Sequence, residues 1–318
     1  MPQEMRIVGL DVAKKKVDAC IHSLGLRRSA PSTPEGEAEL IAWLRANGVR
    51  RVVMEASGGY ERSWAEALRA AGLEVVIVDP KRVRHFAKAA GRLAKNDPID
   101  ADTIARFGEA FPDGEPQAHD AAREEIARLV QARTALKDVE DRIKQQREHD
   151  PPAIVAKAQA AVAKTIRAEL RKLDAAIAAK IKANPTFARR AELIDSVPGL
   201  ADQTAAGVIA WLPELGRISN GAAGALLGAA PYDDDSGERK GARCIKGGRQ
   251  KLRNLLYMPV MGAATQHTPV LKAYYQRLRA KGKEAKVAII ACMRKLIVIL
   301  NTMLARDEPW NPPAQAAA

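Results

Sequence analysis

The first third of the chain alternates short apolar runs with amphipathic stretches. Runs rich in β-branched residues predict strands at residues 5–12, 17–23, 26–30, 51–55 and 73–78. Amphipathic stretches predict helices at about 34–46, 61–71, 81–91 and 98–110. Three strands precede the first helix, and helices separate the later strands. We therefore expect an α/β domain with a mixed sheet, whose first three strands are antiparallel and whose later strands are parallel.

A different pattern fills residues 121–184, which contain no glycine. Apolar residues recur there at steps of three or four, the spacing of one face of a helix. This stripe consists of Ile126, Leu129, Leu136, Ile143, Val162, Ile166, Leu170, Leu173, Ile177 and Ile181. Asp-Pro-Pro at residues 150–152 interrupts the stripe, so we expect two helices. Periodicity leaves open whether they form a hairpin within one chain or a coiled coil between subunits.

The last third of the chain predicts a mostly helical domain. A Pro-Gly turn at residues 198–199 precedes a helix over 201–212, as in helix-hairpin-helix phosphate-binding motifs. The second small residue of such motifs is usually glycine and is alanine here, so an ordinary helix connection stays open as the alternative. The apolar run at 287–304 is interrupted by Arg294 and Lys295, which is typical of a buried core helix rather than a membrane span.

Linker-like composition marks the domain boundaries. Proline, glycine and aspartate concentrate near residues 111–120, and the chain becomes rich in proline and alanine after Arg306. We expect an α/β domain at 1–112, a helical or coiled-coil linker at 113–190, a C-terminal helical domain at 191–306 and a disordered tail at 307–318.

The net charge of +13 is concentrated in one segment. Between Arg239 and Lys295 the chain has fifteen lysines and arginines and one acidic residue, Glu284, which is a local excess of +14. A basic excess confined to one segment favours a polyanionic partner, and nucleic acid is the usual one. A generally solvated surface is the alternative, although such surfaces normally mix both signs of charge.

Cysteine usage and the N-terminus bear on the compartment. The three cysteines are widely spaced and form no metal-ligand pattern, which favours a reducing cytosol. The first residues lack the basic start and apolar run of a signal peptide. We expect a cytoplasmic protein with no membrane partner.

Four carboxylates are candidates for one site. Asp11 and Glu55 lie in apolar strands, where an acid is costly unless it faces a cleft or a partner. Asp97 precedes Pro98 and is expected to cap a helix, so Asp97 and Asp100 share a face of its first turn while Asp102 points elsewhere. Helix capping and surface ion pairs are the simpler interpretation. Clustered carboxylates can instead hold two divalent ions about 3.5–4 Å apart for phosphoryl transfer.

Three segments carry a resemblance to a known family. IVGLDVAK at 7–14, MEASGGY at 54–60 and KNDPIDA at 95–101 resemble the signatures of DEDD transposases, insertion-sequence recombinases related to the Piv invertase. In that family these signatures lie in a RuvC-like domain of the ribonuclease-H type. The resemblance implies that the chain binds Mg²⁺ through Asp11, Glu55, Asp97 and Asp100.

The resemblance continues through the basic segment. Ser236-Gly237, GGR at 247–249 and LRNLLY at 252–257 resemble the family's C-terminal transposase domain, which implies that Ser236 attacks DNA and becomes covalently joined to it. We expect the basic residues around it to neutralise DNA phosphates: Arg239, Lys240, Arg243, Lys246, Arg249, Lys251 and Arg253. The resemblance further implies donor and target DNA, a structured bridge RNA, and a homo-oligomer, dimeric or tetrameric, joined by the coiled coil.

Other functions stay open at this point. A RuvC-like structure-specific nuclease would hydrolyse DNA with water and would need no serine. A non-catalytic nucleic-acid-binding protein would use the basic segment alone. An actin-like ATPase also begins with an aspartate on its first strand, but the turn after Asp11 lacks the glycine that lets phosphates approach.

Overall fold

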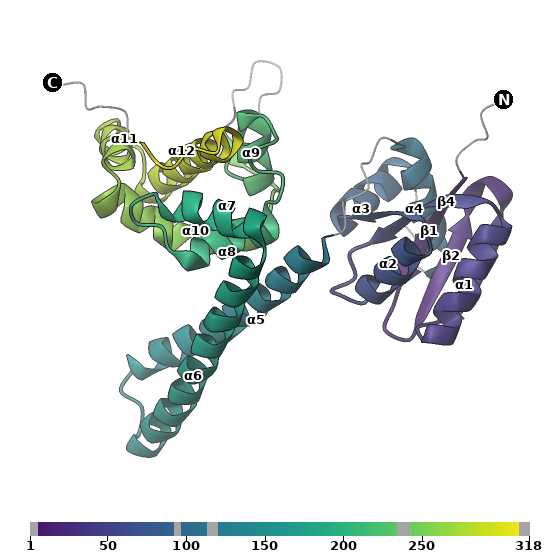
Figure 1. The fold of residues 1–318 in the computed structure, drawn as a ribbon, viewed down its shortest axis with the longest axis horizontal. Helices are drawn as coiled ribbons and strands as arrows, with labels where there is room; N and C mark the ends of the chain where they lie inside the picture. Colours follow the sequence, from purple (N-terminus) through teal and green to yellow (C-terminus); the bar gives the residue numbers. More distant parts are fainter. Residues whose placement is uncertain (1–5, 92–96, 113–119, 234–240, 242, 312–318) are drawn as a thin grey trace. The chain divides into compact units, whose positions relative to one another are not determined.

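The chain divides into two compact units. The computed structural model describes residues 6–91, 97–112, 120–233, 241 and 243–311. Unit 1 comprises residues 1–119 and unit 2 comprises residues 120–318 (Figure 1). The helical segment expected at 113–190 therefore belongs largely to the second compact unit, because its helices pack on those that follow it.

Unit 1 is built on a five-stranded mixed sheet with the strand order β3-β2-β1-β4-β5. Its strands are β1 (Arg6–Val12), β2 (Lys16–Ile21), β3 (Leu26–Pro31), β4 (Val49–Glu55) and β5 (Glu74–Val78). A 3-10 turn, His22–Leu24, joins β2 to β3. The first three strands pair antiparallel, whereas β4 pairs parallel with both β1 and β5. This confirms the predicted mixed sheet.

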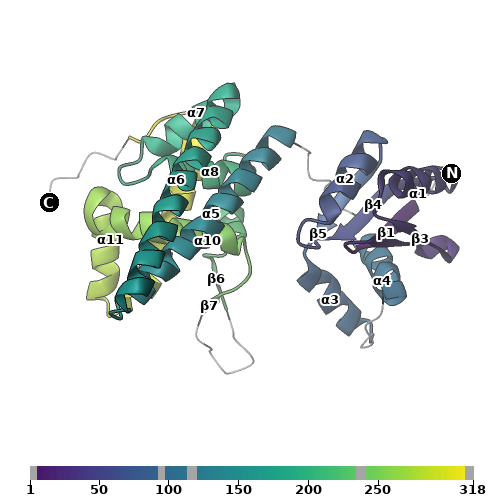
Figure 2. The ribbon, with the colours of Figure 1, turned by 90° about the horizontal axis from the view of Figure 1, so that it is seen from below.

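Helices cover both faces of this sheet. They are α1 (Pro34–Ala46), α2 (Glu61–Ala70), α3 (Pro80–Ala89) and α4 (Asp97–Ala110). Val8 and Leu10 of β1 pack with Trp64 in the core under α1 and α2. The alternate residue Ile7 packs with Ile104 in a second core under α3 and α4. Figure 2 shows the sheet between the two helical layers.

The described residues of unit 2 form helices and one short hairpin. Its elements are α5 (Ala121–Arg147), α6 (Ala153–Ala183), α7 (Pro185–Asp195), α8 (Asp202–Trp211), α9 (Asn220–Leu227), β6 (Pro231–Tyr232), β7 (Cys244–Ile245), α10 (Gln250–Gly262), a π-helical turn (Ala263–His267), α11 (Pro269–Ala280) and α12 (Ala285–Arg306). The chain is thus mixed α/β in unit 1 and mainly α in unit 2.

The stripe in residues 121–184 forms a helical hairpin within one chain. α5 and α6 are separate helices on either side of residues 150–152, as predicted. Arg133 of α5 donates to Asp174 of α6 at 2.6 Å, and Arg167 of α6 donates to Glu140 of α5 at 2.6 Å. Both ion pairs join two helices of the same chain. A further role of this hairpin in joining subunits stays a prediction.

The long apolar helix α12 lies in the core of unit 2. By length and composition it could cross a membrane, but half of its most apolar stretch is buried inside the unit. Cys292, Leu296 and Leu300 pack there against residues of the surrounding helices. The prediction of a core helix is confirmed.

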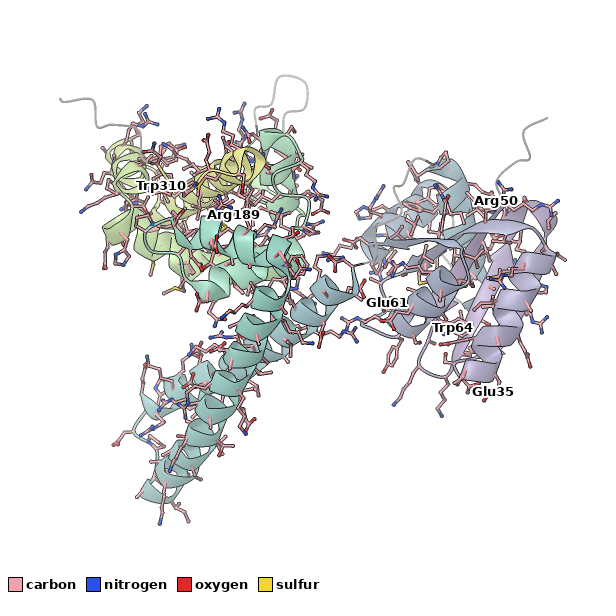
Figure 3. The ribbon with its side chains drawn as sticks, in the orientation of Figure 1. Glu35, Arg50, Glu61, Trp64, Arg189 and Trp310 are labelled. Carbon is pink, nitrogen blue, oxygen red and sulfur yellow. The ribbon has the colours of Figure 1, made fainter. Side chains whose placement is uncertain are left out.

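The expectation that the chain frays directly after Arg306 is wrong for the next few residues. Arg189 Nε donates to Asp307 at 2.8 Å. The backbone N–H of Trp310 donates to Ser196 Oγ at 2.8 Å, and the Trp310 ring packs against the core. Figure 3 labels Arg189 and Trp310. An aromatic residue within a tail otherwise rich in proline and alanine was the signal for this docking. Residues 312–318 of the predicted tail lie outside the described residues.

Candidate functional site

Asp11 and Glu55 lie at the same edge of the sheet in unit 1. Leu10 pairs in register with Met54 across the parallel strands β1 and β4, so the two acids that follow are neighbours. Leu10 and Met54 point into the core under α1 and α2, which turns both acids to the opposite face. Both are half-buried. The acids therefore lie at or next to the C-terminal ends of two adjacent parallel strands, on the face that α3 and α4 cover.

Helix α4 brings a third acid to this edge. A Cβ atom on Gly9 would overlap the backbone of Ala101 and Ala105, so α4 packs directly on the backbone of β1. Gly108, near the other end of α4, lies against Ile7. The helix thus runs antiparallel to β1 with its N-terminus toward the acidic edge. Asp100 immediately precedes the contact residue Ala101, and it is half-buried.

The fourth predicted acid is only partly described. Helix α4 begins at Asp97, but the Asp97 side chain, and hence its predicted capping role, lies outside the described residues. Among the side chains that the structure describes, no group of three or more His, Cys, Asp or Glu residues is close enough to hold a metal ion. The acids at the edge offer only carboxylate oxygens, which are the ligands that hard divalent cations prefer. The donor chemistry fits Mg²⁺, although Asp11, Glu55 and Asp100 do not by themselves lie close enough together to hold it.

Asp102 points away from this edge, as expected. Its side chain is buried, with Oδ1 lying 2.8 Å from His22 Nδ1 in a hydrogen bond and Oδ2 accepting from Arg106 Nε at 3.1 Å. These contacts join the first turns of α4 to the turn after β2. They fix the helix that carries Asp100.

The sheet also places an acid that sequence reasoning did not single out. Asp18 of β2 pairs directly with Asp11 across the antiparallel strands, so the two side chains share a face. Lys16 Nζ lies 2.8 Å from the Asp18 carboxylate, and Ser29 Oγ donates to it. The alternating pattern of residues 16–21 was the sequence signal for the face on which Asp18 lies. The register that sets Asp18 opposite Asp11 depends on how the two strands pair, which is a tertiary property.

The loop after Glu55 is held by a buried carboxylate. Glu61 Oε2 accepts hydrogen bonds from the backbone N–H of Ser57 at 3.0 Å, from Ser57 Oγ at 3.0 Å and from the N–H of Gly59 at 2.8 Å. Gly58 and Gly59 have φ of 75° and 118°, which side chains rarely adopt. Glu61, labelled in Figure 3, therefore fixes the turn that leaves the acidic edge.

Replacing Glu61 with glutamine is expected to loosen this turn. Charge-assisted hydrogen bonds contribute about 1.5–3 kcal/mol each, and glutamine keeps a weaker neutral acceptor. We expect the amides of Ser57 and Gly59 to exchange hydrogen roughly tenfold faster, since about 1.4 kcal/mol corresponds to a factor of ten. Hydrogen-exchange mass spectrometry of the peptide over residues 56–60 measures this. Glu35→Gln, an exposed first-turn change on α1, is the matched control and should leave that peptide unchanged.

The same glutamate predicts a pH dependence. Burial acts to raise the pKa of Glu61, but hydrogen bonds from its own backbone, Gly59 and Ser57 outweigh burial and lower the pKa below its ordinary value of 4.5. The ionised form is therefore the stabilised one. Its contribution is complete above about pH 4.5 and is lost as the pH falls through the lowered pKa. Protection of residues 56–60, corrected for intrinsic exchange, should fall on acidification in the wild type and change less in Glu61→Gln.

In unit 2, a short hairpin flanks the position of the predicted nucleophile. Pro231 pairs with Ile245 and Tyr232 with Cys244, which makes β6 and β7 antiparallel (Figure 2). Ser236, Arg239 and Lys240 lie outside the described residues. The sequence predicted only a loop here, because two-residue strands leave no alternating pattern.

Three glycines clamp the base of this hairpin. A Cβ on Gly248 would overlap the backbone of Gly228 and Leu227, and one on Gly228 would overlap the carbonyl of Gly247. Arg253 Nη1 donates to the carbonyl oxygens of Gly247 at 2.9 Å, Gly228 at 3.1 Å and Leu227 at 3.3 Å. The two chain segments that lead to Ser236 therefore meet backbone to backbone.

The described basic residues of this segment differ in what they contact. Arg249 donates to both carboxylate oxygens of Glu214, at 2.6 and 2.5 Å, and to the carbonyl of Trp211 at 2.8 Å. Burial acts to raise the pKa of Glu214, but the hydrogen bonds from Arg249 and from its own backbone, together with the positive charges of Arg249 and Arg123, outweigh burial and lower the pKa below its ordinary value. Arg249 and Arg253 thus serve the protein's own structure.

The other described basic residues of this segment lie on the surface. Arg243 pairs with Asp233 at 2.5 Å, and exposed Lys251 donates to Gln131 at 3.2 Å. Lys246 is exposed.

The Pro-Gly turn between α7 and α8 carries acids rather than bases. Gly199 has φ of 90°, and Thr268 Oγ1 donates to the carbonyl of Pro198 at 2.6 Å. Partial burial and the neighbouring Asp202 raise the pKa of Asp195 to about 6. The carboxylates of Asp195 and Asp202 flank this turn and would repel a negatively charged phosphate ligand. The contacts favour the ordinary helix connection over the phosphate-binding interpretation.

Comparison with known proteins adds two family matches. Residues 8–149 match a family model of DEDD transposases of IS110 elements, described as a transposase, and residues 191–276 match one described as "Transposase IS116/IS110/IS902 family". The first match contains the acidic edge, and the second contains Ser236 and its basic surroundings.

Curated relatives span most of the chain. The pilin gene-inverting proteins of Moraxella lacunata and Moraxella bovis are each 26% identical over 318 residues, which cover 96% of this chain and 97% of theirs. An uncharacterised 43.6 kDa protein of insertion element IS110 from Streptomyces coelicolor is 27% identical over 153 residues, which cover 48% of this chain and 36% of that protein.

Proposed function

This chain belongs to the IS110 family of transposases, and from that membership we propose that it cleaves and exchanges DNA strands through a covalent link to Ser236. The observation that carries the proposal is the approach of α4 to β1 at Gly9, which brings the first turn of α4, with Asp100, to the edge where Asp11 and Glu55 lie. Three acids from separate segments at one edge are more than helix capping requires.

We propose that unit 1 has a RuvC-like fold of the ribonuclease-H type. The strand order β3-β2-β1-β4-β5, with three antiparallel strands followed by two parallel ones, supports this. The acids lie on the central strand β1, on its parallel neighbour β4 and on the helix α4 that covers them. Residues from several elements can then converge on one phosphate.

Asp11, Glu55, Asp97 and Asp100 are proposed to hold Mg²⁺. A bound divalent ion would neutralise the charge that develops on a phosphodiester during cleavage. The chain's own part is to fix the carboxylates: the sheet register sets Asp11 beside Glu55, and Asp102 with its contacts to His22 and Arg106 holds the turn that carries Asp100.

The proposed chemistry is a transesterification. Ser236 Oγ loses its proton to a base or to solvent and bonds to phosphorus while one P–O bond of the DNA backbone breaks, leaving a DNA hydroxyl. A second DNA hydroxyl then attacks the phosphoserine and releases the serine, which regains a proton. The number of phosphodiester bonds is unchanged, so no external energy source is needed.

The relatives favour strand exchange over hydrolysis. Inverting a gene, the activity for which the Moraxella proteins are named, requires strands to be cut and rejoined. A hydrolytic nuclease cuts without rejoining. Donor and target DNA, a bridge RNA that guides pairing, and a homo-oligomer joined through the helical hairpin complete the proposal, in a cytoplasmic setting. The surface residues Arg243, Lys246 and Lys251 are its described candidates for DNA contacts, with Arg239 and Lys240 beside Ser236.

The test is to trap and map the covalent link. Full-length protein is incubated with Mg²⁺, end-labelled DNA from both ends of its own element, and RNA transcribed from the flank of its gene. We expect a labelled, denaturation-resistant band that protease removes. Mass spectrometry of the nucleotide-bearing peptide should place the modification on Ser236 rather than on Ser219, which caps α9 in the same unit.

Each other result has a definite meaning. Cleaved DNA with no protein attached would overturn the serine chemistry and support a hydrolytic nuclease. Tight binding with neither cleavage nor attachment, on ends shown to be those of the element, would support a non-catalytic binding protein.

A further inference from the structure

Helix α3 of unit 1 has a strongly basic surface. Its residues Lys81, Arg82, Arg84 and Lys88 are exposed, and no acidic residue occurs between Asp79 and Asp97 in the sequence. The positive charge of this helix does not show in the net charge of unit 1, because acidic residues elsewhere in the unit offset it. Nothing in the proposed chemistry has used these cations.

The cations of α3 form a stripe opposite its buried face. Val83 is buried in the core shared with α4, and Phe86 packs against that core. At 100° per residue, Lys81, Arg84 and Lys88 fall on the opposite side of the helix, within about 10 Å along its axis. Arg82 lies between the two faces, with its guanidinium 5.3 Å from the centre of the Phe107 ring.

These cations differ from three arginines of unit 1 that each have a carboxylate partner. In the part of the chain that the structure describes, Lys81, Arg82, Arg84 and Lys88 form no ion pair. By contrast, Arg28 pairs with Glu39, Arg51 with Glu74 and Arg106 with Asp102. Cations that have no internal partner can bind a polyanion without first breaking an ion pair. Their attraction therefore contributes fully to the free energy of binding.

The N-terminal part of the stripe opposes the stability of the helix that carries it, whereas Lys88 in the last turn is favourably placed for the helix macrodipole. Like charges three and four residues apart repel on a helix. The first turn of α3 holds no acid, and cations there face the positive end of the helix macrodipole. Asp79 Oδ1 accepts from the N–H of Lys81 at 2.8 Å, and Pro80 occupies the first turn, so the helix is started by its cap rather than by its surface charges. Cations that destabilise the first turn of their own helix are expected where a negatively charged partner binds them.

The stripe lies next to the acidic edge. Val78, which ends β5, pairs in register with Glu55, and α3 begins two residues later. Helices α3 and α4 cover the same face of the sheet, on which Asp11 and Glu55 also lie. A DNA strand held with its phosphate at the carboxylates must pass the helices of this face, and a row of cations compensates its neighbouring phosphates.

We propose that α3 is a DNA-binding element of unit 1, in which Lys81, Arg84 and Lys88 contact the phosphate backbone of the strand presented to the acidic edge. This rests on the proposed function for its choice of DNA. It adds a second phosphate-binding surface to the one expected around Ser236. Because the contacts are to phosphates, α3 contributes affinity and positioning rather than sequence recognition.

The test measures binding without chemistry. Full-length protein and a fluorescent duplex from the end of its own element are titrated in EDTA at several salt concentrations. In the triple variant Lys81→Gln/Arg84→Gln/Lys88→Gln, the slope of log K against log salt should fall by about 2–3, since each lost phosphate contact removes about 0.9. At roughly 0.1 M salt, the dissociation constant should rise about ten- to a hundredfold.

A matched variant removes equal charge from the opposite end of the sheet. Arg6, Arg45 and Arg50 (Arg50 is labelled in Figure 3) lie at or near the N-terminal ends of β1 and β4 or the C-terminal end of α1. Arg6→Gln/Arg45→Gln/Arg50→Gln should change the slope by less than about 1. Equal slope changes in both variants, with circular dichroism showing both folded, would refute a specific surface on α3.

Two further arms separate the alternatives. A single-stranded RNA of the same length replaces the duplex in one of them, and a loss of affinity confined to RNA would overturn the assignment to DNA. If the wild type forms no covalent adduct but the α3 triple variant still lowers the salt slope, the proposal for α3 stands and the catalytic proposal fails. If the wild type forms the adduct and the α3 triple variant leaves the slope unchanged, the catalytic proposal stands and the proposal for α3 fails.

Discussion

Changing Asp11 to asparagine is expected to lower strand cleavage by about a thousandfold while the protein stays folded. Removing one group that stabilises developing charge typically costs about a hundred- to a thousandfold, and this substitution also removes a charge from the proposed metal-binding set. Asparagine has nearly the shape of aspartate, so the backbone pairing of β1 with β2 and β4 is kept. The measurement is the initial rate of product formation on end-labelled DNA at saturating Mg²⁺.

Asp18→Asn is the control that distinguishes chemistry from local charge. Asp18 pairs with Asp11 across the strands and lies on the same face, but its carboxylate is bonded to Lys16 and Ser29. We expect its loss to lower the rate by less than about tenfold. Equal losses in the two variants would mean that the acidic edge matters only through its total charge, and would remove Asp11 from the proposed ligand set.

Gly248→Ala is expected to destabilise unit 2 by about 2–5 kcal/mol and to abolish adduct formation. Overpacking a close contact costs about 1–3 kcal/mol, and a left-handed backbone with a Cβ costs about 1–2 kcal/mol more. The φ of Gly248 is 71°, and the added Cβ would overlap the backbone of Gly228, which cannot rotate away as a side chain can. Urea unfolding followed by tryptophan fluorescence reports the loss, because Trp211 and Trp310 lie in unit 2 while the two tryptophans of unit 1 should keep the transition of the wild type.

The neighbouring glycine supplies the comparison. Gly247 has a similar φ of 66°, but a Cβ there would meet nothing within 4 Å. Gly247→Ala should therefore cost only the backbone term, about 1–2 kcal/mol, and should keep adduct formation. If both alanine variants unfold at the same urea concentration, the backbone contact between Gly248 and Gly228 does not hold the base of the hairpin.

The sheet of unit 1 could be predicted because its strands are separated by turns and differ from the helices in period. Runs such as 51–55 and 73–78 are apolar on both faces, which is the pattern of strands covered on both sides by helices. The grouping of Asp11 with Glu55 followed from their strand positions. The opposition of Asp11 and Asp18 did not, because register depends on pairing between strands.

The roles of the basic residues could not be read from charge. Arg249 is committed to Glu214, which lies 35 residues earlier in the sequence, and Arg253 to three carbonyl groups near Gly228 and Gly247. A count of charges treats such arginines as equal to the exposed Lys246 and Lys251. The unpaired cations of α3 were missed for the related reason that acids distant in sequence balance them in any sum.

The contact at Gly9 also bears on how freely such a protein can drift in sequence. Where helix and strand meet through side chains, each substitution on one surface must be matched on the other. At Gly9, α4 rests on bare main chain, so the spacing between its first turn and the strand is set there by backbone atoms common to every residue. The height of the first turn of α4 above β1 at this point therefore does not depend on which side chains fill the rest of the core, and a relative that keeps a glycine here could change other core residues and still place its α4 acid at the same edge.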